Sequence, residues 1–256
     1  MIAAKLSVVT SLLFLLVQAA ADPAAVAIVM KWTTESRAIK AFGSDIAFIR
    51  SIPLRNRTVE YSGRLISRKP DEIRLRLDNK TVVGQYCDPN DYAAYIWNGR
   101  TAAEYDGVSK TVTAMRVGSL PTSLDPRKDF ANWWIRKLCS KPLAIRLACD
   151  SYTVFDLLEK YEVKKLKEDA NYVYLELKSR GTKDEESFET VQLVLHGPEV
   201  PKPIMPYSIR TIVITSRNRQ DVSTWDFTNR QLLDKVDSKY FEFVEPPEGW
   251  KLIGSP

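Results

Sequence analysis

The clearest pattern in the chain is a strict alternation of apolar and charged residues in the stretch RKPDEIRLRL. Ile73, Leu75 and Leu77 occupy every second position, and charged residues fill the positions between them. Successive side chains of a strand point to opposite faces of a sheet, so the pattern predicts a strand with one apolar and one charged face. We expect Arg74 and Arg76 to lie in water. The apolar face either belongs to an ordinary core or lines a cavity that holds an apolar ligand.

Strand patterns of the same kind continue along most of the chain. A long hairpin is predicted from strands at 45–52 and 58–67, and a further strand follows at 81–87. Three antiparallel strands are expected between 93 and 117, with Asn98-Gly99 in a type I′ turn because this pair readily takes two positive φ angles. The segments VKKLKED, NYVYLELKSR, TVQLVL, SIRTIVITS and VSTWDFTNRQ predict a second meander.

Helical patterns occur in two places only. A helix is predicted at 26–42 with Gly43 as its stop, and two or three short helices are predicted over about 120–161, broken at Pro142. A parallel α/β protein needs a helix after almost every strand, which this chain lacks. The predicted fold class is therefore α+β, mostly antiparallel β, with a strongly curved sheet and helices laid against one face.

The N-terminus has the features of a secretory signal peptide. Lys5 precedes an apolar run that is shorter than the roughly 20 residues needed to span a bilayer. Small residues then precede Asp22, so we predict cleavage after Ala21, with cleavage after Ala19 or a retained membrane anchor as the alternatives. The predicted organisation is a signal peptide at 1–21 and a single domain at 22–256, without a stable transmembrane anchor.

The charge and the cysteine content of the chain add little to the prediction of its function. The whole chain has a pI of about 9.0, and removal of Lys5 leaves 36 basic and 32 acidic residues, a net charge of +4. This balance is compatible with affinity for anionic lipid headgroups, and no block of like charges indicates nucleic-acid binding. Three cysteines allow at most one disulfide: Cys139 and Cys149 either form it or are small buried residues, like Cys87.

The residues needed for common catalytic and metal sites are missing from the sequence. His196 is the one histidine, and we find no nucleophile elbow, P-loop or dinucleotide-binding motif. Two acidic groups, Asp88 with Asp91 and the three acids at 184–186, stand in turn-like contexts where carboxylates are ordinarily solvated. We therefore predict no catalytic residue, no metal and no cofactor, hence a protein that is not an enzyme.

Motifs along the chain resemble those of the LolA-type periplasmic lipoprotein carriers. In that family a first helix ends in a Ser-Phe-like pair, matched here by Ala41-Phe42, and a hairpin leads to a G-x-L-x-x-K-R-P-like turn, matched by GRLISRKP. A D-G-K-T-like turn is matched by NGRT, and the family's F-x-F-x-P-P-x-G-x ending by FEFVEPPEGWKLI. The segments KLKEDANYVYLEL and VSTWDF resemble more closely an uncharacterised family of exported planctomycete proteins, which brings no established activity.

The LolA-type resemblance implies an incomplete antiparallel barrel, or half barrel, whose apolar concave face is covered by helices that act as a lid over acyl chains. In the carriers an arginine before the turn proline latches this lid; the matching position here is Lys69, with Arg68 beside it. Lysine lacks the planar fork of arginine, so it cannot make the same latch. The expected hydrophobic lining is Ile73, Leu75, Leu77, Tyr95, Trp97, Trp133 and Trp134.

Two non-enzymatic functions remain open at this point, ahead of an enzyme whose acids would have to converge in a cleft from distant strands. The first is an exported protein of the periplasm or cell envelope, a monomer, that binds lipid or lipoprotein acyl chains or another apolar ligand between sheet and helices. The second is an envelope protein-interaction or sensor module that uses its outer surface and binds no ligand.

Overall fold

The structure is a computed structural model that describes residues 22–69, 72–80, 90–116, 144, 147–149, 154–180, 188–201, 204–216 and 221–256. The chain forms two compact units. The first unit comprises Met1–Arg37 and Arg146–Arg219, and the second comprises Ala38–Ile145 and Gln220–Pro256. The predicted signal peptide and cysteines Cys87 and Cys139 lie outside the described residues.

The first unit contains an antiparallel sheet with strand order β7-β8-β9-β10. Its strands are β7 (Tyr161–Glu168), β8 (Tyr172–Ser179), β9 (Phe188–His196) and β10 (Ile209–Ser216), and its helices are α2 (Pro23–Ala38) and α5 (Val154–Lys160). Inward positions alternate along each strand: Val173, Leu175 and Leu177 of β8 are buried, as the period of two in NYVYLELKSR predicts.

Asp22 begins helix α2 and connects it to strand β7. One carboxylate oxygen, Oδ1, accepts a hydrogen bond from the backbone N–H of Ala24 at 3.0 Å, and Oδ2 accepts one from the N–H of Lys165 at 3.0 Å. These donors, the Lys165 N–H foremost, hold the pKa of Asp22 below its usual value. The residue that follows the predicted cleavage site is therefore the helix N-cap.

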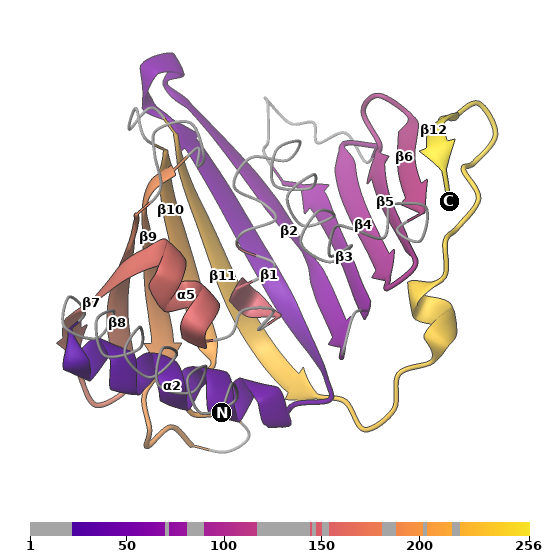
Figure 1. The fold of residues 1–256 in the computed structure, drawn as a ribbon. Coiled ribbons are helices and arrows are strands. Elements are labelled where there is room, and N and C mark those ends of the chain that lie inside the picture. Colours follow the sequence, from indigo (N-terminus) through magenta and orange to yellow (C-terminus); the bar gives the residue numbers. More distant parts are fainter. Residues whose placement is uncertain are drawn as a thin grey trace, which may run out of the picture. The chain divides into compact units, whose positions relative to one another are not determined.

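The second unit contains a sheet with strand order β12-β6-β5-β4-β3-β2-β1-β11 (Figure 1). All neighbours are antiparallel except β12, which pairs parallel to β6. The strands are β1 (Ala41–Ile52), β2 (Arg57–Arg68), β3 (Glu72–Asn79), β4 (Tyr92–Asn98), β5 (Thr101–Asp106), β6 (Thr111–Arg116), β11 (Val222–Leu232) and β12 (Lys251–Ser255). The described part of this unit also contains two 3-10 helices, η1 (Pro53–Arg55) and η3 (Ser238–Phe241).

Two local predictions are wrong. Helix α2 ends at Ala38 rather than at 42, because Phe42 already pairs with Ser67 of β2 and Leu232 of β11, which satisfies its backbone and buries its ring. In the β4–β5 turn only Gly99 has a positive φ (77°), while Asn98 does not. Because β4 ends at Asn98 and β5 begins at Thr101, Gly99 is the first of the two central residues of the turn. A positive φ at this position alone is typical of a type II′ turn rather than type I′.

The mostly antiparallel part of the predicted fold class is confirmed, and helices are few among the described residues. Every predicted strand within the described residues forms within a few residues of its expected bounds. The strand at 81–87 lies outside the described residues, as does most of the helical segment at 120–161, of which α5 is described. Helices that cover a concave face therefore stay a prediction.

Candidate functional site

Pairing between β2, β3 and β4 brings five of the predicted lining residues to one face of the second unit's sheet. Leu75 stands opposite Leu65 on β2 and Tyr95 on β4, and Ile73 stands opposite Trp97. Leu75 and Leu77 are fully buried, Tyr95 is 1% exposed, and Ile73 is 7% exposed. Trp97 is half-buried. We call this side of strands β11 and β1–β5 the apolar face.

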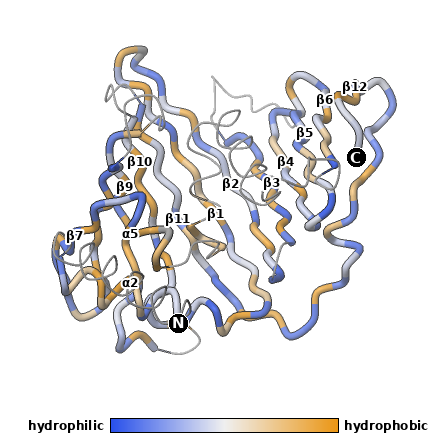
Figure 2. The backbone as a smooth tube through the Cα atoms, viewed as in Figure 1, coloured by the Kyte–Doolittle hydropathy of each residue, from blue (hydrophilic) through white to orange (hydrophobic). Residues whose placement is uncertain are grey.

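The apolar face continues across β1 and β11. Ile46 pairs with Phe227, and Phe48 pairs with Trp225, whose ring centroid lies 4.3 Å from that of Phe48. All four side chains are at most 3% exposed. Figure 2 shows the alternating hydropathy along the strands that produces this surface. Sequence alternation alone had identified only its β3 and β4 portion.

A polar residue interrupts the apolar face on β5. Glu104 stands opposite Tyr95, and the Tyr95 hydroxyl donates a hydrogen bond to Glu104 Oε1 at 3.3 Å. Burial raises the pKa of Tyr95 well above its usual value, and the negative charge of Glu104 raises it further. The hydroxyl therefore stays protonated in the folded protein under conditions where an exposed tyrosine ionises.

This shift predicts a loss of stability at alkaline pH. Tyr95 ionises near pH 10 in the unfolded chain, while its pKa in the folded protein lies higher. The protonated hydroxyl therefore contributes fully to the free energy of unfolding below pH 10, and this contribution is lost as the pH rises above 10. Between pH 10 and 11 the wild type should lose up to about 1.4 kcal/mol more unfolding free energy than Tyr95→Phe. Urea unfolding at pH 7, 9, 10 and 11 measures this, and parallel curves for the two proteins would contradict the assignment.

The opposite, charged face is partly covered by the chain's own C-terminus. Arg74 donates from Nη1 to the carbonyl of Tyr240 at 3.0 Å and its guanidinium lies 5.9 Å from the Tyr240 ring centroid. Arg76 is exposed, as expected, and pairs with Asp78 at 2.9 Å. The expectation that both arginines lie in water thus holds for Arg76, whereas Arg74 is half-buried.

Residues 236–255, which we call the C-terminal segment, pack on the same side of the sheet over β4–β6, where apolar residues replace the arginines of β3. Phe243 and Trp250 of this segment pack against a cluster of buried residues on these strands. The cluster consists of Ile96, Ala103, Tyr105, Val112 and Ala114. The Tyr105 hydroxyl donates to the carbonyl of Val244 at 2.7 Å and accepts from its N–H at 3.0 Å. Strands β4 and β5 therefore carry buried residues on both faces, as the unbroken apolar run Tyr95-Ile96-Trp97 in β4 indicates.

The residues predicted as a lid latch lie at the end of β2 and in the turn that follows. Lys69 donates its backbone N–H to the carbonyl of Lys40 at 2.8 Å. Arg68 pairs with Glu72, donates to the carbonyl of Val236 at 2.6 Å, and lies over the ring of Phe241. These described contacts of Arg68 are with β3 and the C-terminal segment. Trp133 and Trp134 lie outside the described residues, so the latch and their lining role stay predictions.

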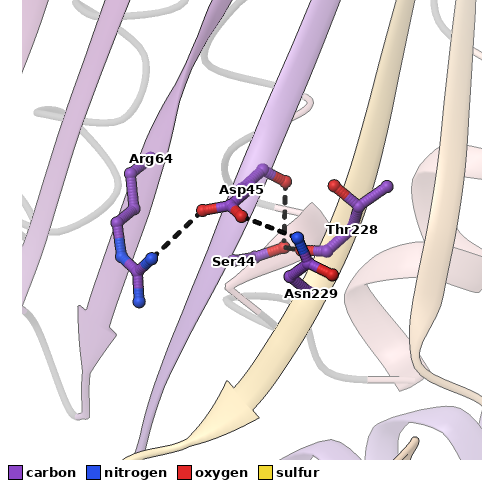
Figure 3. Close-up of polar contacts among 5 residues, drawn as sticks. All are labelled: Ser44, Asp45, Arg64, Thr228 and Asn229. Atoms are coloured by element: carbon purple, nitrogen blue, oxygen red, sulfur yellow. Dashed lines mark hydrogen bonds and ion pairs between the residues drawn. The ribbon is translucent and has the colours of Figure 1, made fainter.

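A second polar arrangement, missed in the sequence, stands where β1 and β11 shift register (Figure 3). Asp45 accepts a hydrogen bond from Arg64 Nη1 of β2 at 3.1 Å and one from Asn229 Nδ2 of β11 at 2.9 Å. Ser44, fully buried, donates to the carbonyl of Thr228 at 2.9 Å. Asn229 has a φ of 49°, so these bonds hold a β-bulge in place. The cluster contains neither a nucleophile with a base nor a ligand set for a metal.

Within the described part of the chain, no helix is long and apolar enough to cross a membrane. In the same residues, no group of three or more His, Cys, Asp or Glu side chains could hold a metal ion. Cys149 is buried at 5% exposure. A bridge to Cys139, the alternative to two small buried cysteines, stays untested because Cys139 lies outside the described residues.

No family model matches the chain, and no curated protein sequence matches it. Several solved structures are similar. A DUF1329 family protein from Desulfovibrio piger has 11% identity and a TM-score of 0.44, with 86% of this chain and 96% of that chain covered. A LolA superfamily protein from Nitrosomonas europaea has 11% identity and a TM-score of 0.39, with 84% and 96% covered. A putative outer membrane lipoprotein-sorting protein domain from Vibrio parahaemolyticus has 9% identity and a TM-score of 0.42, with 85% and 95% covered.

At identities of 11% or less and TM-scores below 0.5, these likenesses carry no function to this chain. The narrower likeness to exported planctomycete proteins stays a prediction.

Proposed function

We propose that the protein is an exported, non-enzymatic protein of the periplasm or cell envelope that binds a lipid, lipoprotein or other apolar ligand against its apolar face. The proposal includes a signal peptide at 1–21, a monomeric mature chain, and no cofactor. Helices of the 120–161 segment, with Trp133 and Trp134, would cover the ligand, as the LolA-type motifs imply.

One observation carries the proposal. The apolar face extends over six neighbouring strands of the second unit, and its large side chains come from β1, β2, β3, β4 and β11. The opposite face of β4–β6 is already covered by the C-terminal segment, which packs its own aromatic residues there. We therefore assign the acyl chain to the apolar face, where burial would contribute about 0.8 kcal/mol per methylene. Because Leu75, Phe48 and Trp225 are at most 1% exposed, the ligand would have to displace the groups that cover them.

Ala102 and Ala103 offer a matched test, because they are neighbours on β5 with opposite orientations. Each is 1% exposed; Ala102 stands opposite Trp97 on the apolar face, and Ala103 stands opposite Ile96 beneath the C-terminal segment. A leucine at either site overpacks its surroundings and should cost about 1–3 kcal/mol of stability. Only Ala102→Leu fills space on the apolar face.

The measurement is native mass spectrometry of protein purified from its own cell envelope, with lipid identified after extraction. We expect copurified lipid in the wild type and in Ala103→Leu, and at least about tenfold less in Ala102→Leu, in line with the cost of overpacking. Wild-type protein without lipid would overturn ligand binding. Equal lipid in the two variants would place the ligand elsewhere.

The second candidate, an interaction or sensor module, is favoured by a different observation. The C-terminal segment leaves Tyr240, Val244, Leu252 and Ile253 between 39% and 51% exposed. Crosslinking in the native envelope would support this function if a partner is captured by the wild type and lost on Val244→Ser, while Ala102→Leu still captures it.

A further inference from the structure

The most exposed of the large apolar side chains in the described residues lies at the end of the β1–β2 hairpin. Leu54 is 71% exposed and sits in the 3-10 turn η1 between the two longest strands of the second unit. Exposed apolar residues placed singly are ordinary on a protein surface. Leu54 differs from such single residues because it lies at the end of a hairpin and because positive charge surrounds it.

The hairpin extends beyond its neighbour. Strand β2 pairs with β3 only from Tyr61 onward, so Arg57–Val59 pair with β1 alone. Asn56 closes the turn in the left-handed conformation with φ 45°, and its N–H donates to the carbonyl of Pro53 at 3.0 Å. On the other side β1 stays paired with β11 up to Ser51, so Leu54 is held at the end of an ordered hairpin that extends past β3 (Figure 1).

Charge at this end is positive. The residues from 51 to 58, SIPLRNRT, contain Arg55 and Arg57 and no acidic residue. Arg57 is exposed, and Arg50, at the base of the hairpin, is already paired with Asp221. A leucine flanked by arginines fits the boundary of an anionic bilayer, where the apolar side chain enters the acyl region and the cations stay with the phosphates.

A second turn at the same edge repeats this chemistry. Strands β1, β3 and β5 run in the same direction, because each neighbouring pair is antiparallel. The β5–β6 turn therefore lies at the same end of the strands as the β1–β2 turn, and we call this end of the strands the edge. That turn exposes Val108 at 66%, with exposed Lys110 two residues later. Two exposed apolar side chains with nearby cations thus lie at this end of the strands. The second turn also contains the carboxylate of Asp106, which accepts hydrogen bonds from the backbone N–H groups of Val108 at 3.0 Å and Ser109 at 3.1 Å, so the first turn carries the stronger positive charge.

We propose that this edge is a membrane-docking surface, at which Leu54, assisted by Val108, inserts into the interface of an anionic bilayer and Arg57 contacts lipid phosphates. The association is peripheral and reversible, since so few apolar side chains add little buried area. It goes beyond the proposed function and does not require a bound ligand.

Flotation of the mature chain with vesicles tests this, using phosphatidylcholine alone and phosphatidylcholine with 30% phosphatidylglycerol. The wild type should float with the anionic vesicles and much less with the neutral ones. Leu54→Ser should weaken partitioning about tenfold, and Arg57→Ser about fivefold on anionic vesicles only.

Leu232 provides the matched control. It is a leucine of similar exposure, 59%, at the end of β11, and β11 runs antiparallel to β1, so Leu232 lies at the opposite edge of the sheet. Leu232→Ser should partition like the wild type. The proposal is overturned if the wild type does not float with anionic vesicles, if Leu54→Ser floats unchanged, or if Leu232→Ser loses as much as Leu54→Ser.

Discussion

Replacing Gly63 by alanine is expected to lower the free energy of unfolding by about 3 kcal/mol or more. Gly63 lies in the middle of β2, opposite Leu77 on β3. A Cβ atom there would lie 1.7 Å from the carbonyl oxygen of Arg76 and 2.7 Å from its carbonyl carbon. Those are backbone atoms of the neighbouring strand, so no side-chain rotation relieves the clash. The β2–β3 pairing that positions Leu75 must open or shift.

Denaturant unfolding measures this effect, with Gly249→Ala as the control. Gly249 has a φ of 80° but nothing lies within 4 Å of a Cβ placed on it, so only backbone strain of about 1 kcal/mol is expected. A variant Gly63→Ala that fails to fold agrees with the prediction. One as stable as Gly249→Ala would show that the two strands do not approach as closely as the register of β2 and β3 requires.

The strands were predictable because burial on one face leaves a period of two in the sequence. Ile73, Leu75 and Leu77 illustrate this: every second residue is buried, and the alternation is unbroken. The end of α2 was not predictable in the same way. Phe42 stands at both helical and strand spacing from its apolar neighbours, and only its pairing with β2 and β11 decides between the two.

The candidate site was predictable in composition but not in extent. Leu75 and Tyr95 face the same side because they pair across β3 and β4, which the alternation suggests. The contributions of Phe48 and Trp225 depend on β1 pairing with β11, strands more than 160 residues apart in the chain, and no local pattern carries that information. The cover over the charged face likewise depends on a contact between Tyr105 and Val244, 139 residues apart.

Phe241 is the anchor of that cover, and its replacement by alanine should cost about 3–5 kcal/mol. Its ring is 0% exposed at the end of η3, and the guanidinium of Arg68 lies 5.2 Å from the ring centroid. Truncation leaves a cavity where the C-terminal segment meets β3 and β4. We expect faster amide hydrogen exchange in Val244 and in Lys251–Ser255, because these residues follow the lost anchor in the chain.

Tyr240→Ala is the control for this change. Tyr240 is 51% exposed, and the hydrogen bond from Arg74 ends on its backbone carbonyl, which the substitution keeps. Its cost should be under about 1 kcal/mol, the value of an exposed cation–π contact. Equal losses in the two variants would mean that the segment is held by the outer arginines and not by its buried ring.

Comparison of Phe241→Ala with Ala102→Leu separates stability from ligand binding. The C-terminal segment lies on the charged face, whereas Leu75 and Ala102 lie on the apolar face of the same strands. Phe241→Ala exposes Tyr105 and Val112, so it should increase binding of a hydrophobic dye without removing copurified lipid from molecules that remain folded. If lipid is lost in Phe241→Ala and kept in Ala102→Leu, the apolar ligand occupies the charged face beneath the segment, and the assignment of the two faces must be exchanged.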